Sequence, residues 1–203
     1  MYSEAFQDEF VDIVLKDQKQ GYFVDVGGGC HEQKGGSNTL MFEEKGWKGI
    51  IVDVDPNRMV GRSCICAASW IGDGSENSKK LGDVLKENNV PNLVDYLSID
   101  IEGQDFNALK SFIDSGFTSK VVTIEHNVFL GNPEVTQLKA NIFNLLTLNG
   151  YVRIVDNAGN AANAKNFYLG VPFEDWYINL KHINYSDTIQ RIKALQKASL
   201  QNT

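Results

Sequence analysis

Three acidic side chains and one histidine stand where chemistry could occur, at the ends of two apolar segments. Asp100 and Glu102 follow one of these segments, and Glu125 and His126 end the next. An imidazole, whose unperturbed pKa is about 6.5, can accept a proton near neutral pH. His126 is therefore the first candidate for a general base, and the two segment ends are the candidate catalytic centre. The alternative for His126 is a structural role in capping the end of a strand.

The same side chains could also hold a hard divalent cation. Carboxylate oxygens with one imidazole suit magnesium or manganese, which would lower the pKa of a bound hydroxyl group. The candidate ligands are Asp100, Glu102, Glu125 and His126. The alternative is that Glu102 and Glu125 orient loops through hydrogen bonds to backbone amides.

A glycine cluster, Gly27-Gly28-Gly29, follows the first β-type segment and directly precedes a polar stretch. Glycines let the backbone pass close to a ligand, and Asp25 beside them could organise the loop or meet a charged group. Asp53 ends the next β-type segment, where a carboxylate can accept hydrogen bonds from ribose hydroxyls and repels phosphate. The dinucleotide fingerprint G-x-G-x-x-G fails at Glu32, which disfavours a pyrophosphate cofactor.

Short β-type runs alternate with helical stretches along the chain. This alternation predicts an α/β fold with a doubly wound, mostly parallel, Rossmann-like sheet of seven strands and helices on both faces. The expected strands are 22–26, 49–53, 63–67, 93–100, 121–125, 151–156 and an antiparallel edge strand at 166–171. The expected helices are 4–16, 38–45, one ending near residue 87, 104–115, 133–148 and 186–200. In such sheets ligands bind beyond the carboxyl ends of the strands, where the acidic residues above are found.

Length and composition favour a single soluble domain over residues 1–203. The 203 residues suffice for one α/β core, with 42% apolar and 22% charged residues. A net charge of −7 argues against nucleic acid as a partner. No signal-peptide pattern or long apolar run is present, so no membrane partner and a cytoplasmic location are expected.

Three blocks of the sequence resemble the FkbM-type methyltransferase family: FVDVGGGCHEQKGGSNTLMFEEKGWKGIIVDVDPN, VDYLSIDIEGQDFNALKS and VVTIEHN. They extend over about half of the chain in the family's order. The resemblance implies an S-adenosylmethionine-dependent O-methyltransferase with a class I methyltransferase fold. It also implies a cofactor site formed by Asp25, Gly27, Gly29, Ser37, Asn38, Asp53 and Asp100. Two departures are Gly28-Gly29 where the family often has Ala-Asn, and Asp53-Val54 where it often has Glu-Pro.

The expected reaction is transfer of a methyl group from S-adenosylmethionine to a hydroxyl group of a carbohydrate or another small-molecule acceptor. Such a displacement needs an aligned acceptor and a base that removes its proton. A catalytically silent adenosyl- or partner-binding module is one alternative, and a nicotinamide-dependent oxidoreductase is another. The oligomeric state stays open, although an edge strand and an apolar terminal helix could serve a homodimer.

Aromatic residues gather late in the sequence, and they could either line an acceptor pocket or pack in the core. They are Phe167, Tyr168, Phe173, Trp176 and Tyr177. Core packing is the favoured interpretation, because aromatic side chains bury the largest apolar areas.

Overall fold

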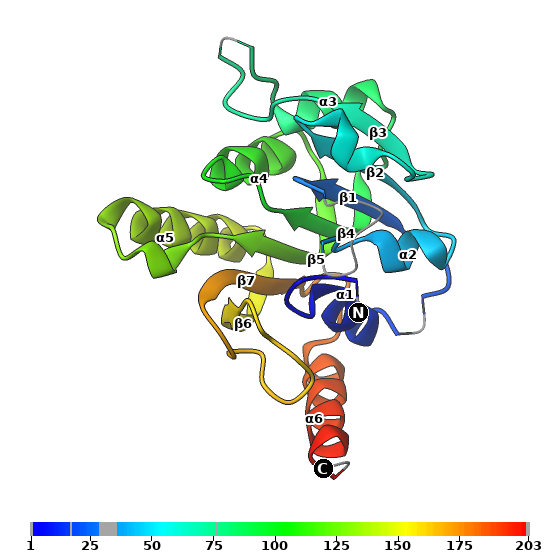
Figure 1. Cartoon of the computed structure of the whole chain (residues 1–203), viewed down its shortest axis with the longest axis vertical. Coiled ribbons are helices and arrows are strands. Elements are labelled where there is room, and N and C mark those ends of the chain that lie inside the picture. Colours follow the sequence, from blue (N-terminus) through cyan, green and yellow to red (C-terminus); the bar gives the residue numbers. More distant parts are fainter. Residues whose placement is uncertain (1, 17, 29–35, 76, 202–203) are drawn as a thin grey trace.

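The structure of the protein is a computed structural model, which describes residues 2–16, 18–28, 36–75 and 77–201. Within these residues, strands form one seven-stranded sheet in the order β3-β2-β1-β4-β5-β7-β6 (Figure 1). The strands are β1 Tyr22–Val26, β2 Lys48–Asp53, β3 Ile65–Ala68, β4 Leu93–Ile99, β5 Thr118–Glu125, β6 Tyr151–Gly159 and β7 Pro172–Asn179. The helices are α1 Gln7–Val14, α2 Leu40–Glu44, α3 Leu81–Glu87, α4 Asp105–Asp114, α5 Pro133–Leu148 and α6 Tyr185–Gln201, with short 3₁₀ turns η1 Pro56–Met59 and η2 Val128–Leu130.

The direction in which the chain crosses the sheet reverses between β1 and β4. From β1 the chain proceeds outward through β2 to β3, and then returns to β4 on the other side of β1, all in parallel register. β5 continues in parallel beside β4, and β7 is antiparallel to both β5 and β6. The carboxyl ends of β1, β2, β4 and β5 therefore share one edge of the sheet, which is where an open α/β sheet binds ligands. The predicted fold class is confirmed.

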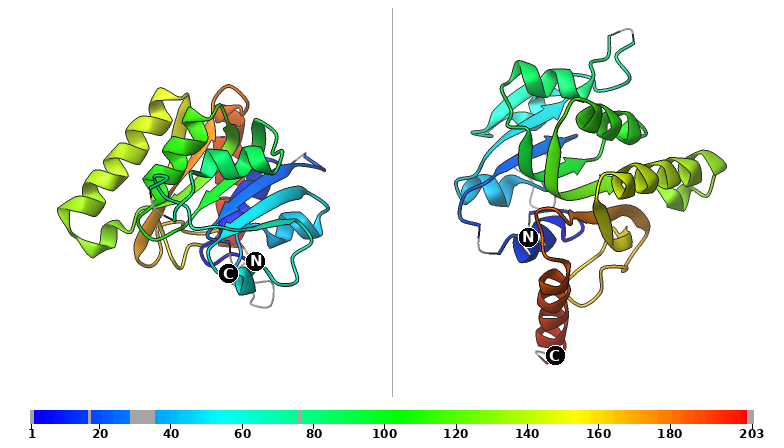
Figure 2. Two further views of the ribbon diagram at one scale, coloured as in Figure 1. Left: turned by 90° about the horizontal axis from the view of Figure 1, so that it is seen from above. Right: turned by 180° about the vertical axis from the view of Figure 1, so that it is seen from behind.

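Two apolar layers hold the helices against the sheet. One layer joins the inward side chains of the central strands to Leu85 of α3, Phe112 of α4 and Leu146 of α5. The other joins the opposite face of the sheet to α1, α2 and α6, with Phe10 of α1 against Trp176 at 4.7 Å between ring centroids. Figures 1 and 2 show α3, α4 and α5 side by side on one face and α1 and α2 on the other. Each fully buried large apolar side chain contributes about 1.5–3 kcal/mol.

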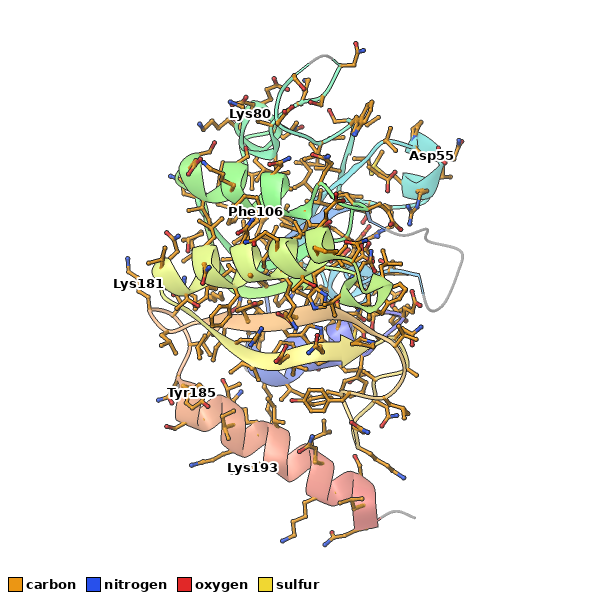
Figure 3. The ribbon with its side chains drawn as sticks, turned by 90° about the vertical axis from the view of Figure 1, so that its left-hand side faces the viewer. Asp55, Lys80, Phe106, Lys181, Tyr185 and Lys193 are labelled. Carbon is orange, nitrogen blue, oxygen red and sulfur yellow. The ribbon has the colours of Figure 1, made fainter. Side chains whose placement is uncertain are left out.

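Helix α6 extends away from the sheet towards the C-terminus. Ile192 is buried and Leu195 half-buried against the second layer, whereas much of the helix is exposed (Figure 3, with Tyr185 and Lys193 labelled). No helix in the described part of the chain combines the length and apolar character needed to cross a membrane.

The prediction of an antiparallel edge strand at residues 166–171 is wrong. These residues form turns, and Gly170 has a φ of +93° that a regular strand does not accommodate. The antiparallel strand is β7, which lies inside the sheet between β5 and β6, and β6 is the edge strand. The acidic pair Glu174-Asp175 obscured β7 in the sequence, because buried carboxyl groups interrupt the apolar pattern of an internal strand.

Element boundaries differ from those expected mainly at the N-terminus. α1 begins at Gln7 rather than residue 4, because Phe6 takes a left-handed conformation with a φ of 71°. The aromatic cluster packs largely in the core, as the sequence favoured: Phe167, Phe173, Trp176 and Tyr177 are buried, and Tyr168 is 58% exposed.

Candidate functional site

A cavity of about 200 Å³ lies where the chain direction reverses, beyond the ends of β1, β2 and β4. We call it the β1–β2–β4 cavity. Its lining residues are Gly27, Val52, Asp53, Val54, Arg58, Ser69, Trp70, Ile71, Asp100, Ile101 and Glu102. One side is apolar, with the Trp70 side chain 59% exposed, and the other carries carboxylates. Such a mixture suits a ligand with a flat apolar part and hydroxyl groups.

Asp53 projects its carboxylate from the end of β2 into this cavity. Oδ1 accepts a hydrogen bond from the backbone N–H of Asp55 at 2.8 Å, which fixes the side chain. Oδ2 is buried without a hydrogen-bond partner, and the Nη1 atom of Arg58 lies 3.5 Å away. A buried carboxylate oxygen without a hydrogen-bond donor destabilises the protein unless a ligand supplies the donor. Asp53 is therefore positioned to accept a hydrogen bond from a hydroxyl group of a ligand.

Gly27 lets β1 end in close contact with the strand beside it. Its φ is +84°, and a Cβ atom at this position would lie 1.8 Å from the carbonyl oxygen of Asp100. Glycine is therefore required here for two reasons: the backbone conformation and the approach to Asp100.

We expect Gly27→Ala to destabilise the fold by at least about 2 kcal/mol, which lowers the Tm by about 5 °C or more. Gly46→Ala is the matched control, because Gly46 has the same φ of +84° but no atom within 4 Å of the place that a Cβ would take. Thermal unfolding of both variants separates the clash from the backbone strain. Equal losses in the two variants would contradict the role of the Asp100 contact.

Asp25, Ser37 and Asn38, which the resemblance assigns to a cofactor site, bind protein groups and do not line the cavity. Asp25 is buried and accepts a hydrogen bond from Thr39 Oγ1 at 2.6 Å, so it organises the segment before α2 instead of lining the cavity. Ser37 is also buried and accepts from the backbone N–H of Leu40, and Asn38 donates to Ser98 Oγ at 3.0 Å. Gly29 lies outside the described residues.

A second cavity, of about 420 Å³, adjoins the first beyond the ends of β4, β5 and β7. We call it the β4–β5–β7 cavity. It is lined by Glu4, Asp100, Glu102, Glu125, Asn127, Phe129, Leu130, Asn160, Val171 and Phe173. Asp100 and Glu102 line both cavities and so form the wall between them. Three of the four predicted catalytic residues, Asp100, Glu102 and Glu125, are thus brought together.

The environment of Asp100 and Glu125 raises the pKa of both carboxyl groups. Burial, and then the negative charge of Asp100, raises the pKa of Glu125 to about 10. Burial also raises the pKa of Asp100, while a hydrogen bond from Glu125 acts in the opposite direction. Glu125 is thus the protonated member of the pair at neutral pH. Asp100 is the member that is left to accept a proton from a ligand. Burial also raises the pKa of Glu174, which lies opposite Glu125 in the sheet.

The loop after β4 is held by Asp105, a residue that the sequence did not single out. Its carboxylate accepts hydrogen bonds from the backbone N–H groups of Ile101 at 3.0 Å and Gly103 at 2.9 Å. Glu102 between them has a φ of 53°, and Asn127 after β5 has a φ of 49°. Left-handed conformations of non-glycine residues cost about 1–3 kcal/mol and cluster at functional sites.

His126 does not line either cavity. Its side chain is buried, Nδ1 accepts from the backbone N–H of Val128 at 3.1 Å, and Nε2 lies 3.1 Å from Asp175 Oδ1. Because Nδ1 accepts, Nε2 carries the hydrogen and donates it to Asp175, so neither nitrogen is left to take a proton from a substrate. This geometry favours the structural alternative for His126 over the general-base role.

Asp175 is the centre of the network that holds His126. Burial alone would raise the pKa of Asp175, but the hydrogen bond from His126 and its other partners hold it below its usual range. These partners include the backbone N–H of Asn157 at 2.8 Å and Arg153 Nη1 at 3.0 Å. The network joins β5, β6 and β7 on the side of the second cavity.

We expect His126→Gln to lower the free energy of unfolding by about 1–3 kcal/mol. Glutamine cannot accept the hydrogen bond from Val128 and donate one to Asp175 at the same time. If His126 is structural, turnover per folded molecule in the reaction that the resemblance implies changes less than about threefold. Removal of a general base would instead reduce turnover by about 10²–10⁴-fold. His182→Gln is the control, because His182 is half-buried and lines neither cavity. Urea unfolding, with turnover measured below the transition, decides between the two roles.

The proposed metal set is not assembled. Within the described part of the chain, no group of three or more His, Cys, Asp or Glu side chains has the arrangement needed to hold a metal ion. The physical reason lies partly in His126, whose ring nitrogens are both occupied by protein partners. The candidate set of Asp100, Glu102, Glu125 and His126 is therefore corrected.

Of the aromatic residues that the sequence offered for a pocket, Phe173 lines the β4–β5–β7 cavity, but the other aromatic residues of the two cavities were missed. Trp70 follows β3 and Phe129 lies in η2, exposed by 59% and 49%. Both are large apolar residues in polar loops directly after a strand, and this signal could have identified them. Arg58 was missed because a single arginine in a loop carries no recognisable pattern.

The comparisons with known proteins address the family and the fold. Residues 71–153 match the model of the methyltransferase FkbM domain. This match covers less than half of the chain but includes Asp100, Glu102 and Glu125, and it confirms the FkbM resemblance. The segment that holds the ends of β4 and β5 is thus similar in sequence to that domain. No protein of curated function matches the chain.

Two solved structures share the fold with the FkbM-like chain. One, from Klebsiella pneumoniae, is provisionally named an O-methyltransferase; it has 11% identity and a TM-score of 0.53, with 86% of this chain and 80% of that chain covered. The other, from Streptococcus thermophilus, is provisionally named a hemolysin; it has 12% identity and a TM-score of 0.52, with 98% and 74% covered. At such low identities the likeness concerns the fold alone.

Proposed function

We propose that the protein uses S-adenosylmethionine to methylate a hydroxyl group on a sugar or another small molecule. The observation that carries this proposal is the buried, unpartnered Oδ2 atom of Asp53 in the β1–β2–β4 cavity. A carboxylate at the end of the second strand would hold the ribose hydroxyls of the cofactor. When bound, the cofactor supplies an activated methyl group.

The remaining cavity residues fit this ligand. Trp70, Ile71 and Val54 offer the apolar surface on which an adenine ring would lie. Gly27 allows the backbone to approach, and Asp100 places a negative charge where the sulfonium carries a positive one. Among the described lining residues, a phosphate-bearing dinucleotide would meet three carboxyl groups, from Asp53, Asp100 and Glu102, and one guanidinium, from Arg58. This excess of acidic groups disfavours the oxidoreductase alternative.

Asp100 is the proposed acceptor of the proton that the hydroxyl group loses. It lines both cavities, so it faces the acceptor and the cofactor at once. Glu125 is protonated at neutral pH and donates to Asp100, which orients the Asp100 carboxylate. In this proposal Asp100 and Glu125 replace His126 in the proton transfer.

Calorimetric titration of the purified chain with S-adenosylmethionine, S-adenosylhomocysteine and NAD tests the proposal. Micromolar binding of both adenosyl ligands, with weak or no binding of NAD, is the expected result. Formation of S-adenosylhomocysteine with hydroxyl-bearing acceptors would then establish turnover. Adenosyl binding without turnover would favour the silent module, and binding of NAD alone would overturn the proposal.

A further inference from the structure

The titratable side chains among the described lining residues of the β4–β5–β7 cavity are all acidic. Four carboxyl groups line it, from Glu4, Asp100, Glu102 and Glu125, and no lysine, arginine or histidine is among its described lining residues. Some carboxylates elsewhere in the described structure have cationic partners, as for Asp175 with Arg153 and Asp95 with Lys120. An anionic acceptor, such as a sugar phosphate, would be repelled from this cavity.

Glu125 provides a second and independent observation. The residue is only 7% exposed, it lines the cavity, and its Oε2 atom is buried without a hydrogen-bond partner. Nearly all buried polar atoms in proteins have a partner, and exceptions need a reason such as a ligand. Glu125 is protonated in the free protein, and a cation beside Oε2 would favour its ionised form and supply the hydrogen-bond donor that this atom lacks.

The remaining side chains of the cavity indicate which kind of carbon skeleton such a ligand would have. Phe129 and Leu130 are 49% and 58% exposed beside the carboxyl groups, and Phe173 forms part of the wall. These side chains offer apolar contact to a carbon skeleton, while the side chain of Asn127 adds a neutral donor and acceptor at the rim. A small molecule with one cationic end and an apolar or ring body matches this lining.

We infer that the acceptor carries a protonated amino group, which the β4–β5–β7 cavity binds through Glu125 with help from Asp100 and Glu102. The inference rests on the proposed function, since it names the chemical class of the acceptor for the same site. An ammonium group supplies the donor that Oε2 lacks and balances the carboxylates of the shared wall. A neutral hydroxyl group would supply a donor but no charge.

Matched pairs of small molecules test this inference on the protein without cofactor. Tyramine is compared with 4-ethylphenol, and glucosamine with N-acetylglucosamine, because each pair differs in the cationic amino group. Calorimetry or ligand-observed NMR is expected to show at least about tenfold tighter binding of the amine in at least one pair, the effect of one charge-assisted hydrogen bond. Equal affinity within both pairs would overturn the inference.

Variants locate the effect within the cavity. Glu125→Gln keeps the shape but cannot form the carboxylate that a bound ammonium group favours, so the preference for the amine is expected to vanish. Glu102→Gln changes an exposed residue of the same cavity and is expected to reduce the preference for the amine in part. This variant provides the test if the Glu125 variant does not fold. Glu87→Gln is the matched control, because Glu87 is exposed on α3 and lines neither cavity. An amine preference that survives in the Glu125 and Glu102 variants would place the amine elsewhere.

Two further outcomes separate this inference from the proposed function. Amine binding that depends on Glu125, in a protein that does not bind S-adenosylmethionine, would overturn the methyltransferase proposal alone. Binding of S-adenosylmethionine with methylation of neutral acceptors only would overturn the amine inference alone. Tight binding of Mg²⁺ that depends on Glu125 would also overturn it, because the missing partner would then be a metal ion.

Discussion

Replacement of Asp53 by alanine is expected to weaken binding of S-adenosylmethionine by at least about 100-fold. The side chain projects from β2 into the β1–β2–β4 cavity, and its Oδ2 atom is buried without a partner. Two hydrogen bonds from ribose hydroxyls to a carboxylate contribute about 1.5–3 kcal/mol each, and a loss of about 3 kcal/mol corresponds to more than 100-fold in Kd. Calorimetry with S-adenosylmethionine and S-adenosylhomocysteine measures the loss directly.

Two control variants make this result specific. Asp53→Asn keeps the volume but turns one acceptor into a donor, so an intermediate loss of about tenfold is expected. Asp55→Ala makes the same chemical change two residues later, outside the cavity, and should leave the affinity within about threefold. Thermal unfolding is measured for all three proteins. Unchanged affinity in a folded Asp53→Ala protein would remove the observation on which the proposed function depends.

The fold could be predicted from the sequence because most of the strands have a simple pattern. β1 and β2 are mainly apolar runs that lead into a glycine or an acid, and such runs are typical of parallel strands buried on both faces. β7 has the opposite character, since Glu174 and Asp175 lie in its middle and are buried. Local sequence does not reveal that β6, α1 and β5 surround these acids, and the strand was therefore placed six residues too early.

The site could be predicted only in part for a related reason. Strand ends identify which residues reach the ligand-binding edge, and Asp53, Asp100, Glu102 and Glu125 do reach it. The direction of each side chain depends on the face of the strand and on partners far away in the sequence. His126 follows Glu125 directly, yet its ring turns away to Asp175, which is 49 residues further along the chain. Asp25 likewise turns to Thr39 rather than to the cavity.

Glu125→Gln is expected to stabilise the protein at alkaline pH. Burial and the charge of Asp100 raise the pKa of Glu125 from 4.5 to about 10 in the folded state. Between these values the folded state keeps a proton that the unfolded state has released, so the unfolded state binds fewer protons. Stability of the unmodified protein therefore falls as the pH rises through this range. Asp105, whose pKa is raised mainly by burial to about 6, adds a smaller fall between pH 4 and 6.

Glutamine at position 125 does not titrate, so the variant loses the fall that begins near pH 4.5 and keeps the part that Asp105 causes. We expect it to exceed the unmodified protein by up to about 5 kcal/mol in free energy of unfolding at pH 8, and to equal it near pH 4.5. Urea unfolding at pH 4.5, 6.5 and 8 measures the difference, and Glu87→Gln should show none at any of the three. A variant that is less stable than the unmodified protein at pH 8 would contradict the raised pKa.

A gain in stability at pH 8 would also bear on function. A residue whose replacement stabilises the fold does not contribute to stability itself. Such a stabilising replacement at a functional site usually lowers activity. Glu125 combines burial, an unpartnered oxygen and a position in the wall of a cavity. If Glu125→Gln is more stable and no longer prefers amines, then the unfavourable carboxyl group is explained by the ligand that it binds. If the variant is more stable and its ligand preference is intact, Glu125 serves neither the fold nor the recognition of an amine.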